Sequence, residues 1–138
     1  MKLLEIVRTR ATSAATLSTA FEFAKRLGKV GVLSGVCDGF IGNRILAAYR
    51  RQGDYLLADG ATPAEIDAAM RAYGMPMGPY ELQDLTGLQI GWANRKRQAP
   101  GRSAAERYVD IADTLCEQER FGQRSGRGWY QYLSLIHI

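Results

Sequence analysis

The chain has 138 residues, a length that suits one ordinary domain. Hydrophobic residues make up 46% of it and charged residues 23%, which excludes an intrinsically disordered chain. The formal net charge of +4 is mild, and no run of eighteen apolar residues occurs, so neither a strongly basic nucleic-acid binder nor a membrane-spanning protein is expected.

Cysteine usage and the N-terminal sequence bear on the cellular compartment. Cys37 and Cys116 lie far apart and in no metal-ligand spacing, so we expect free thiols in a reducing environment and no metal site. The N-terminus shows no apolar run followed by a small-residue cleavage site, which is the pattern of a signal peptide. The expected location is therefore the cytoplasm.

The first 35 residues predict a strand, a helix and a second strand. Residues 2–8 are mostly apolar and partly β-branched, as in a short strand. Thr12 and Ser13 offer a helix N-cap, and Gly28 follows the last apolar residue of that helix as a stop. A second strand is expected over residues 29–34. Two strands are too few for a stable sheet, so the segment is interpreted as the end of a larger sheet.

From about Cys37 onward the pattern predicts helices only. Asp38 is expected to cap a long helix that reaches about Asp59, with Gly60 as a stop. Two capping boxes and a glycine- and proline-punctuated loop organise the rest. In chain order we expect a helix opened by Thr62–Glu65 and ending at Gly74, a loop over 74–79, short helices over 81–85 and 88–97, a helix opened by Ser103–Glu106, and a loop over 122–128.

This order of elements favours the end of a dinucleotide-binding domain followed by a helical domain. A Gly-x-Gly-x-x-Gly turn after a strand is absent from the sequence, and Gly126-Arg-Gly128 is too short a match with no helix after it. The predicted fold is mainly α, a helical domain preceded by a strand-helix-strand remnant of a Rossmann-type domain.

Four sequence blocks carry a family resemblance. Together, in this order and spacing, they resemble the 3-hydroxyacyl-CoA dehydrogenase family over residues 1–132, and the second half is most similar to the bifunctional forms that also contain an enoyl-CoA hydratase. The resemblance implies that residues 1–35 end a truncated NAD-binding domain, 36–132 form the helical C-terminal domain, and 133–138 are an unmatched tail. The blocks are Met1–Val7 (MKLLEIV), Asp38–Arg44 (DGFIGNR), Gly74–Leu82 (GMPMGPYEL) continued by Asp84–Leu88 (DLTGL), and Arg120–Tyr132 (RFGQRSGRGWYQY).

The resemblance implies a reaction of fatty acid β-oxidation in which the 3-hydroxyl of an acyl-CoA becomes a ketone and NAD receives a hydride. Such chemistry needs a base for the hydroxyl proton. In the family the base is a histidine oriented by a glutamate, and Glu5 holds the glutamate's place, where it would fix the ring and stabilise the imidazolium. The histidine itself lies upstream of the position matched by Met1. His137 lies outside the resemblance, so the chain alone is expected to be nearly inactive.

Other site residues follow from the same resemblance. Asn43 matches an asparagine that helps to position substrate and histidine, a role that suits an amide because its hydrogen bonding involves no change of charge. Arg124 falls where the family carries a basic residue, often lysine, that reaches the cofactor; a solvated loop arginine is the other interpretation. Residues of the 74–79 loop could line the acyl pocket or only pack against helices: Met75, Pro76, Met77 and Pro79.

Two alternatives stand beside the enzyme hypothesis. In the related short-chain enzymes the helical domain supplies the dimer contact, so the chain could be a non-catalytic helical module that forms a homodimer. A nucleic-acid binder that uses the arginine clusters is disfavoured, because no aromatic platform or recognition-helix pattern accompanies the charge. The expected partner is an acyl-CoA, with no nucleic acid and no membrane.

Overall fold

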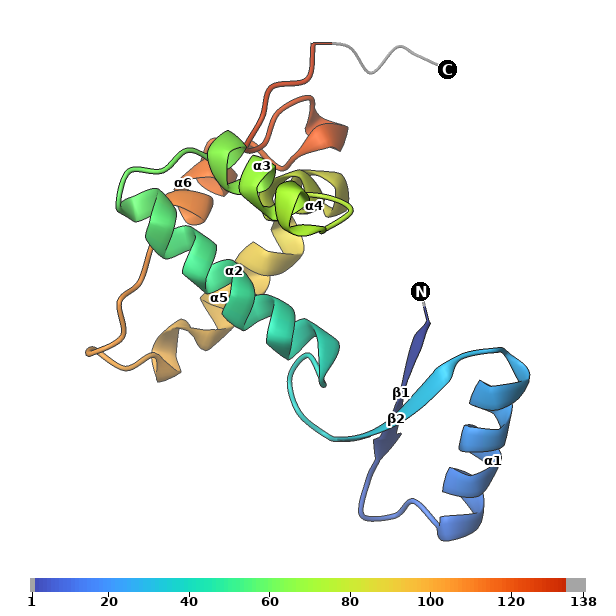
Figure 1. The fold of residues 1–138 in the computed structure, drawn as a ribbon. Coiled ribbons are helices and arrows are strands. Elements are labelled where there is room, and N and C mark those ends of the chain that lie inside the picture. The colour runs from blue at the N-terminus through green and yellow to red at the C-terminus, as the bar shows by residue number, and fades with distance from the viewer. Residues whose placement is uncertain (1, 134–138) are drawn as a thin grey trace. The chain divides into compact units, whose positions relative to one another are not determined.

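The computed structural model describes residues 2–133, which form two compact units that divide between Tyr49 and Arg50 (Figure 1). The first unit holds a two-stranded sheet and one helix, and the second holds helices. The helix α2, Gly42–Ala58, runs across the division. The expected fold class, a mainly helical chain behind a strand-helix-strand segment, is confirmed.

The first unit begins with β1 (Leu3–Arg8), α1 (Ala14–Arg26) and β2 (Val30–Gly35). The strands are parallel and in register from Leu3 opposite Val30 to Arg8 opposite Gly35. The hydroxyl of Ser13 accepts the N–H of Thr16, so Ser13 is the predicted N-cap of α1. Figure 1 shows α1 alongside the two strands, where Ala24 and Ile6 are buried.

The predicted start of the long helix is wrong by several residues. The helix α2 begins at Gly42 and not directly after Asp38. Gly39 and Phe40 have φ values of 73° and 47°, in the left-handed region, so the chain cannot continue a right-handed helix through them. A left-handed phenylalanine is uncommon, and its place directly before α2 marks this turn as a constrained element.

The second unit contains four further α-helices among its described residues. A buried cluster that includes Leu57, Tyr80, Cys116 and Trp129 forms its core. Tyr80 and Trp129 pack edge to face with ring centroids 4.6 Å apart. The elements are α3 (Pro63–Tyr73), α4 (Pro79–Thr86), α5 (Gln89–Gln98), the 3-10 helix η1 (Ala99–Gly101), α6 (Ile111–Glu117) and the 3-10 helix η2 (Gln123–Ser125).

The first predicted capping box is confirmed and the second is wrong. Thr62 and Glu65 cap α3 reciprocally, and Gly74 ends α3 with a φ of 115°. The Ser103–Glu106 segment opens no helix, and α6 starts only at Ile111. The carboxylate of Glu106 pairs with Arg51 at 2.9 Å, so it is unavailable to complete a box.

The helix α4 begins at Pro79, two residues before its predicted start, because proline suits the first helical position. Residues 134–138 of the expected tail lie outside the described residues. Among the described helices, none is both long and apolar enough to cross a membrane.

Candidate functional site

Glu5 lies on β1 and points its carboxylate at the beginning of α2. One carboxylate oxygen accepts the N–H of Ile41 and the other accepts the N–H of Gly42, each at 2.9 Å. The first amides of a helix have no partner within the helix and carry partial positive charge, so an anion is favoured there. A side chain 36 residues earlier thus caps α2 in place of a local residue.

Asn43 follows directly after the two amides that Glu5 binds. It is the second residue of α2, its side chain is exposed, and its N–H donates to the carbonyl of Gly39 at 3.1 Å. The structure therefore brings Glu5 and the backbone that carries Asn43 together within the first unit. The predicted catalytic roles of Glu5 and Asn43 stay predictions.

A groove of about 310 Å³ lies beside this turn, and sequence reasoning did not anticipate it. Its lining is apolar except for one guanidinium, so it suits an apolar chain next to an anionic group. The sequence feature that could have indicated this groove is the set of apolar residues spaced three and four apart at the start of α2. The lining residues are Phe40, Ile41, Arg44, Ile45 and Ala48.

The remaining predicted site residues all belong to the second unit. Arg124 lies on η2 and is exposed, a position open to an anionic ligand. Met75 and Pro76 are exposed and Met77 is half-buried in the loop between α3 and α4. Pro79 is buried at the first position of α4, so it has a structural role as a helix start. A pocket-lining role for these four residues stays a prediction.

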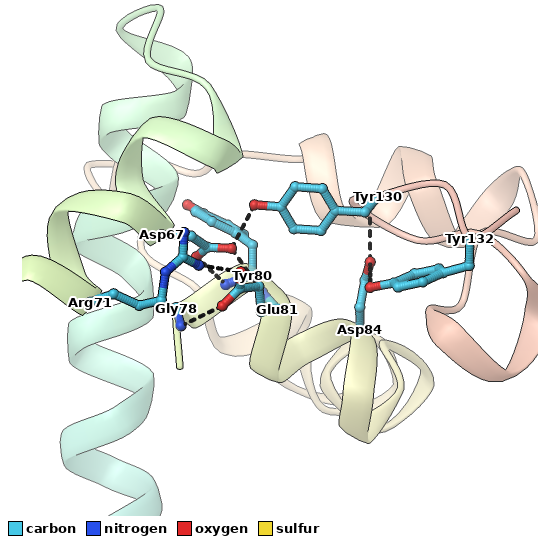
Figure 2. A network of polar contacts seen from close by, with 8 residues as sticks. All are labelled: Asp67, Arg71, Gly78, Tyr80, Glu81, Asp84, Tyr130 and Tyr132. Carbon is cyan, nitrogen blue, oxygen red and sulfur yellow. Dashed lines mark hydrogen bonds and ion pairs between the residues drawn. The ribbon is translucent and has the colours of Figure 1, made fainter. Parts of the chain in front are cut away.

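Two buried aspartates form a network that the sequence did not reveal (Figure 2). Asp67 of α3 is fully buried and accepts the N–H groups of Tyr80 and Glu81 at 2.8 and 3.0 Å, which caps α4. The hydroxyl of Tyr130 donates to the same carboxylate at 2.6 Å. Gly78 has no room for a side chain, because a Cβ there would overlap Asp67.

Asp84 of α4 holds residues 129–132 through hydrogen bonds of the same kind. It is 1% exposed and accepts the N–H groups of Trp129 and Tyr130, each at 2.9 Å, and the hydroxyl of Tyr132 at 3.0 Å. A Cβ on Gly128 would overlap this carboxylate. The two aspartates therefore anchor the segment that follows the Arg124 loop onto α3 and α4 (Figure 2).

A second charged cluster lies between α2, α5 and α6. Burial raises the pKa of Asp54 to about 6, against the opposing influence of the Arg95 and Arg50 guanidiniums. Burial also lowers the pKa of Arg50. Arg95 binds Asp113 at 2.6 Å, and both side chains are about a quarter exposed or less. The cluster is a packed structural feature, and its titration affects stability.

The described residues contain part of a dinucleotide-binding domain but no pyrophosphate cradle. The parallel β1–β2 pair with α1 on it fits the architecture of such a domain. The turn from β1 into α1 carries no glycine, and its Thr9 and Thr12 hydroxyls bind each other at 2.9 Å. This turn therefore does not fit a pyrophosphate, and we assign no NAD contact to it.

Comparison with known proteins assigns the chain to a family. Residues 39–132 match the model of the 3-hydroxyacyl-CoA dehydrogenase C-terminal domain, and residues 1–37 match the NAD binding domain of the same family. The chain belongs to the 3-hydroxyacyl-CoA dehydrogenase family. The resemblance seen in the four sequence blocks is confirmed, and NAD is the cofactor of this family.

The curated relatives are peroxisomal bifunctional enzymes. This chain is 46% identical to the peroxisomal bifunctional enzyme of Cavia porcellus over 151 aligned positions, which cover 99% of the chain and 21% of the relative. The peroxisomal bifunctional enzyme of Homo sapiens is 43% identical over the same shares. The chain thus spans about a fifth of the length of these relatives.

Solved structures of dehydrogenases share its fold. The (S)-3-hydroxybutyryl-CoA dehydrogenase of Ralstonia eutropha superimposes with a TM-score of 0.84 at 29% identity, covering 97% of this chain and 48% of the other. The 3-hydroxybutyryl-CoA dehydrogenase of Escherichia coli gives a TM-score of 0.84 at 32% identity, with coverage of 100% and 30%. Each of these solved chains is longer than the chain described here.

Proposed function

We propose that this chain is part of an NAD-dependent enzyme that oxidises a 3-hydroxyacyl-CoA to the 3-ketoacyl-CoA in fatty acid β-oxidation. The observation that carries the proposal is the placement of Glu5 against the turn that begins α2, directly before Asn43. Membership of the dehydrogenase family supplies the reaction class. In that reaction the C3 hydrogen leaves as a hydride to NAD and the hydroxyl proton leaves to a base.

Glu5 and Asn43 serve the reacting group in this proposal. A carboxylate has about four acceptor sites, and α2 uses two of them, so Glu5 can still receive an imidazole N–H and stabilise its cation. Asn43 can donate to the substrate oxygen without changing charge. The groove beside Phe40, with Arg44 at its wall, suits an acyl chain near an anionic CoA group.

In this proposal the base is a histidine outside these 138 residues, so we expect the 138-residue chain to be nearly inactive. The measurement is NADH absorbance with acetoacetyl-CoA, for this chain and for an N-terminally extended chain that includes the upstream histidine. We expect turnover only in the extended chain. Substantial turnover by the 138 residues alone would contradict this account of the base.

The site residues can be tested in the extended chain. We expect Glu5→Gln and Asn43→Ala each to lower kcat about a hundredfold, because each removes a contact used in the transition state. Glu22→Gln, an exposed glutamate on α1, is the matched control and should leave kcat unchanged. Full activity in both site variants would leave only a structural function for this region.

Arg124 is proposed to contact an anionic part of NAD. We expect Arg124→Ala in the extended chain to raise the KM for NAD about tenfold while kcat changes little. Arg124→Lys keeps the positive charge and should retain a KM within about threefold of the parent value. An unchanged KM for NAD in Arg124→Ala would show that this exposed side chain does not contact the cofactor.

A helical dimerisation module is the second candidate function. Several large apolar side chains are exposed, among them Ile45 at 67% and Ile90 at 70%. Light scattering of the chain would give the mass of a dimer under this hypothesis, and Glu5→Gln and Asn43→Ala would leave the extended chain's activity intact.

The location and the remaining partners also stay predictions. The curated relatives are named as peroxisomal enzymes, whereas the sequence predicts a cytoplasmic chain. Imaging of a tagged full-length protein would decide between these two compartments. The absence of nucleic-acid and membrane partners is expected from the composition.

A further inference from the structure

We propose that residues 102–110 form a strap within the second unit, and that this strap opens when the buried carboxylate of Asp54 loses its proton. The strap connects η1 to α6 and contains neither helix nor strand (Figure 1). Most of its side chains are exposed, so little apolar burial holds it in place. This inference is independent of the proposed catalytic function.

Two exposed ion pairs attach the strap to α2. Glu106 pairs with Arg51 at 2.9 Å, and Arg107 pairs with Asp59 at 2.6 Å. The hydroxyl of Tyr55 also donates to the carbonyl of Arg107 at 3.2 Å. Exposed ion pairs stabilise a fold only slightly, because water and salt screen them. The strap is therefore weakly attached along α2.

The strap also contacts the charged cluster between α2, α5 and α6. The guanidinium of Arg102 stacks on the ring of Tyr108, 3.3 Å from the ring centroid, and its Nη2 lies 3.5 Å from the carbonyl oxygen of Arg95. The hydroxyl of Tyr108 donates to the carboxylate of Asp113. Asp113 also accepts the Nε–H of Arg95 at 2.6 Å. A rearrangement of Arg95 and Asp113 would therefore disturb the strap.

Asp54 is the group in this cluster whose charge changes in the mildly acidic range. Burial raises its pKa to about 6, against the attraction of the neighbouring guanidiniums. The helix α4 approaches α2 closely beside it, because a Cβ on Gly53 would lie 2.9 Å from the Tyr80 hydroxyl. Charged and titratable groups from α2, α4, α5 and α6 face the carboxylate: Arg50, Tyr80, Arg95 and Asp113.

Two donors of the cluster have no hydrogen-bond partner among the described residues. They are Nε of Arg50 and Nη2 of Arg95, and both atoms are buried. An ionised Asp54 offers acceptors to both guanidiniums, so its formation would draw Arg95 away from Asp113. An ionised buried carboxylate also favours hydration, which an open strap permits. Loss of the Asp54 proton and opening of the strap therefore favour each other.

The direction of the pH effect follows from proton binding. Opening hydrates Asp54 and lowers its pKa toward the ordinary value, so the open strap binds fewer protons than the closed one. Opening should therefore become more favourable from about pH 4 to about pH 6 and level off above that.

Cleavage by a glutamate-specific protease would measure the opening, because Glu106 lies in the strap. The rate of cleavage after Glu106 would be measured at pH 4.5 and 6.5 and divided by the rate for a peptide of residues 99–111 at the same pH. This ratio removes the pH dependence of the protease and reports the population of the open strap. We expect the ratio to rise about tenfold in the parent chain and to show no such rise in Asp54→Asn.

Two further variants separate Asp54 from other carboxylates. Glu117→Gln, an exposed change on α6, is the control and should keep the rise. Arg50→Gln removes a cation that favours the ionised Asp54, so the rise should move to higher pH. An equal rise in the parent and in Asp54→Asn, or no rise in the parent, would overturn the proposal. A rise in Arg50→Gln at the same pH as in the parent would also contradict it.

Discussion

Asp67 gathers three hydrogen bonds on one fully buried carboxylate, so it is the residue whose charge and shape matter most in the second unit. We expect Asp67→Asn to lower the free energy of unfolding by about 2–3 kcal/mol, because one oxygen becomes a donor that faces a donor. Tyr130→Phe removes only the hydroxyl bond and should cost about 1 kcal/mol.

Urea denaturation of the two variants would check this order. Glu117→Gln, an exposed change on α6, is the control and should shift the midpoint little. Equal stabilities for Asp67→Asn and the parent chain would mean that water replaces the buried partners.

The buried carboxylate of Asp54 should make the stability of the fold depend on pH. Burial raises its pKa to about 6, above its value in the unfolded chain, so the folded state binds more protons between about pH 4 and 6. The stability contribution of Asp54 is therefore full below pH 4 and declines as the pH rises through 6. We expect Asp54→Asn to lack this decline, which is on the order of 2 kcal/mol.

Denaturant midpoints at pH 4, 5, 6 and 7 would measure the effect as the difference between parent and variant. Other carboxylates titrate in the same way in both proteins, so the difference isolates Asp54. A difference that stays constant with pH would show that Asp54 keeps an ordinary pKa in the folded protein.

At the scale of elements, the loop between α3 and α4 offers a matched pair of glycines. Gly78 has an ordinary φ of −68°, but a Cβ there would overlap Asp67, so Gly78→Ala should cost about 3 kcal/mol through the disrupted cap. Gly74 has open space around it but a φ of 115°, so Gly74→Ala should cost only about 1 kcal/mol.

Thermal unfolding followed by circular dichroism would compare the two variants. The larger loss is expected in Gly78→Ala, although Gly74 is the glycine with the unusual backbone. The reverse order would mean that α4 moves away from α3 and makes room for the methyl group.

Local sequence signals predicted most helices and strands. They failed where a residue far away in the sequence determines which hydrogen bonds a side chain makes. Ser13 and Thr62 cap helices as expected, since a cap involves only residues three apart. Glu106 has the same local pattern but binds Arg51, 55 residues away. Glu5 was identified from a family block, whereas its bonds to α2 depend on tertiary structure.

The buried aspartates illustrate the same limit. Asp67 and Asp84 look like ordinary polar residues on helix surfaces, because nothing within one turn of either shows which backbone amides they will meet. The only indirect signals were Gly78 and Gly128, whose missing side chains make room for them. A glycine becomes informative in this way only after the facing residue is known.

At the scale of the whole molecule, the two compact units differ in how much they bury. Among the described residues, the first unit buries Ile6, Ala24 and Ser34, whereas the second has a cluster of seven buried residues. We expect β1 amides to exchange through openings at least about 2 kcal/mol less costly than those of α4.

Tryptophan fluorescence offers an independent comparison, because Trp92 and Trp129 both belong to the second unit. Its urea transition should lie at a higher concentration than the loss of β1 protection. Coincident transitions would show that the chain unfolds as one cooperative body.

The hydrogen bonds between Asp84 and residues 129–132 also determine when the second unit can finish folding during synthesis. Helices α2 to α6 leave the ribosome before the groups of residues 129–132 that Asp84 binds and before the Tyr130 hydroxyl that Asp67 binds. Until residues 129–132 emerge, the Asp84 carboxylate would be buried without these partners, which is strongly unfavourable. We therefore expect the nascent helices to stay loosely packed. They should pack tightly only when Trp129, Tyr130 and Tyr132 have emerged from the ribosome.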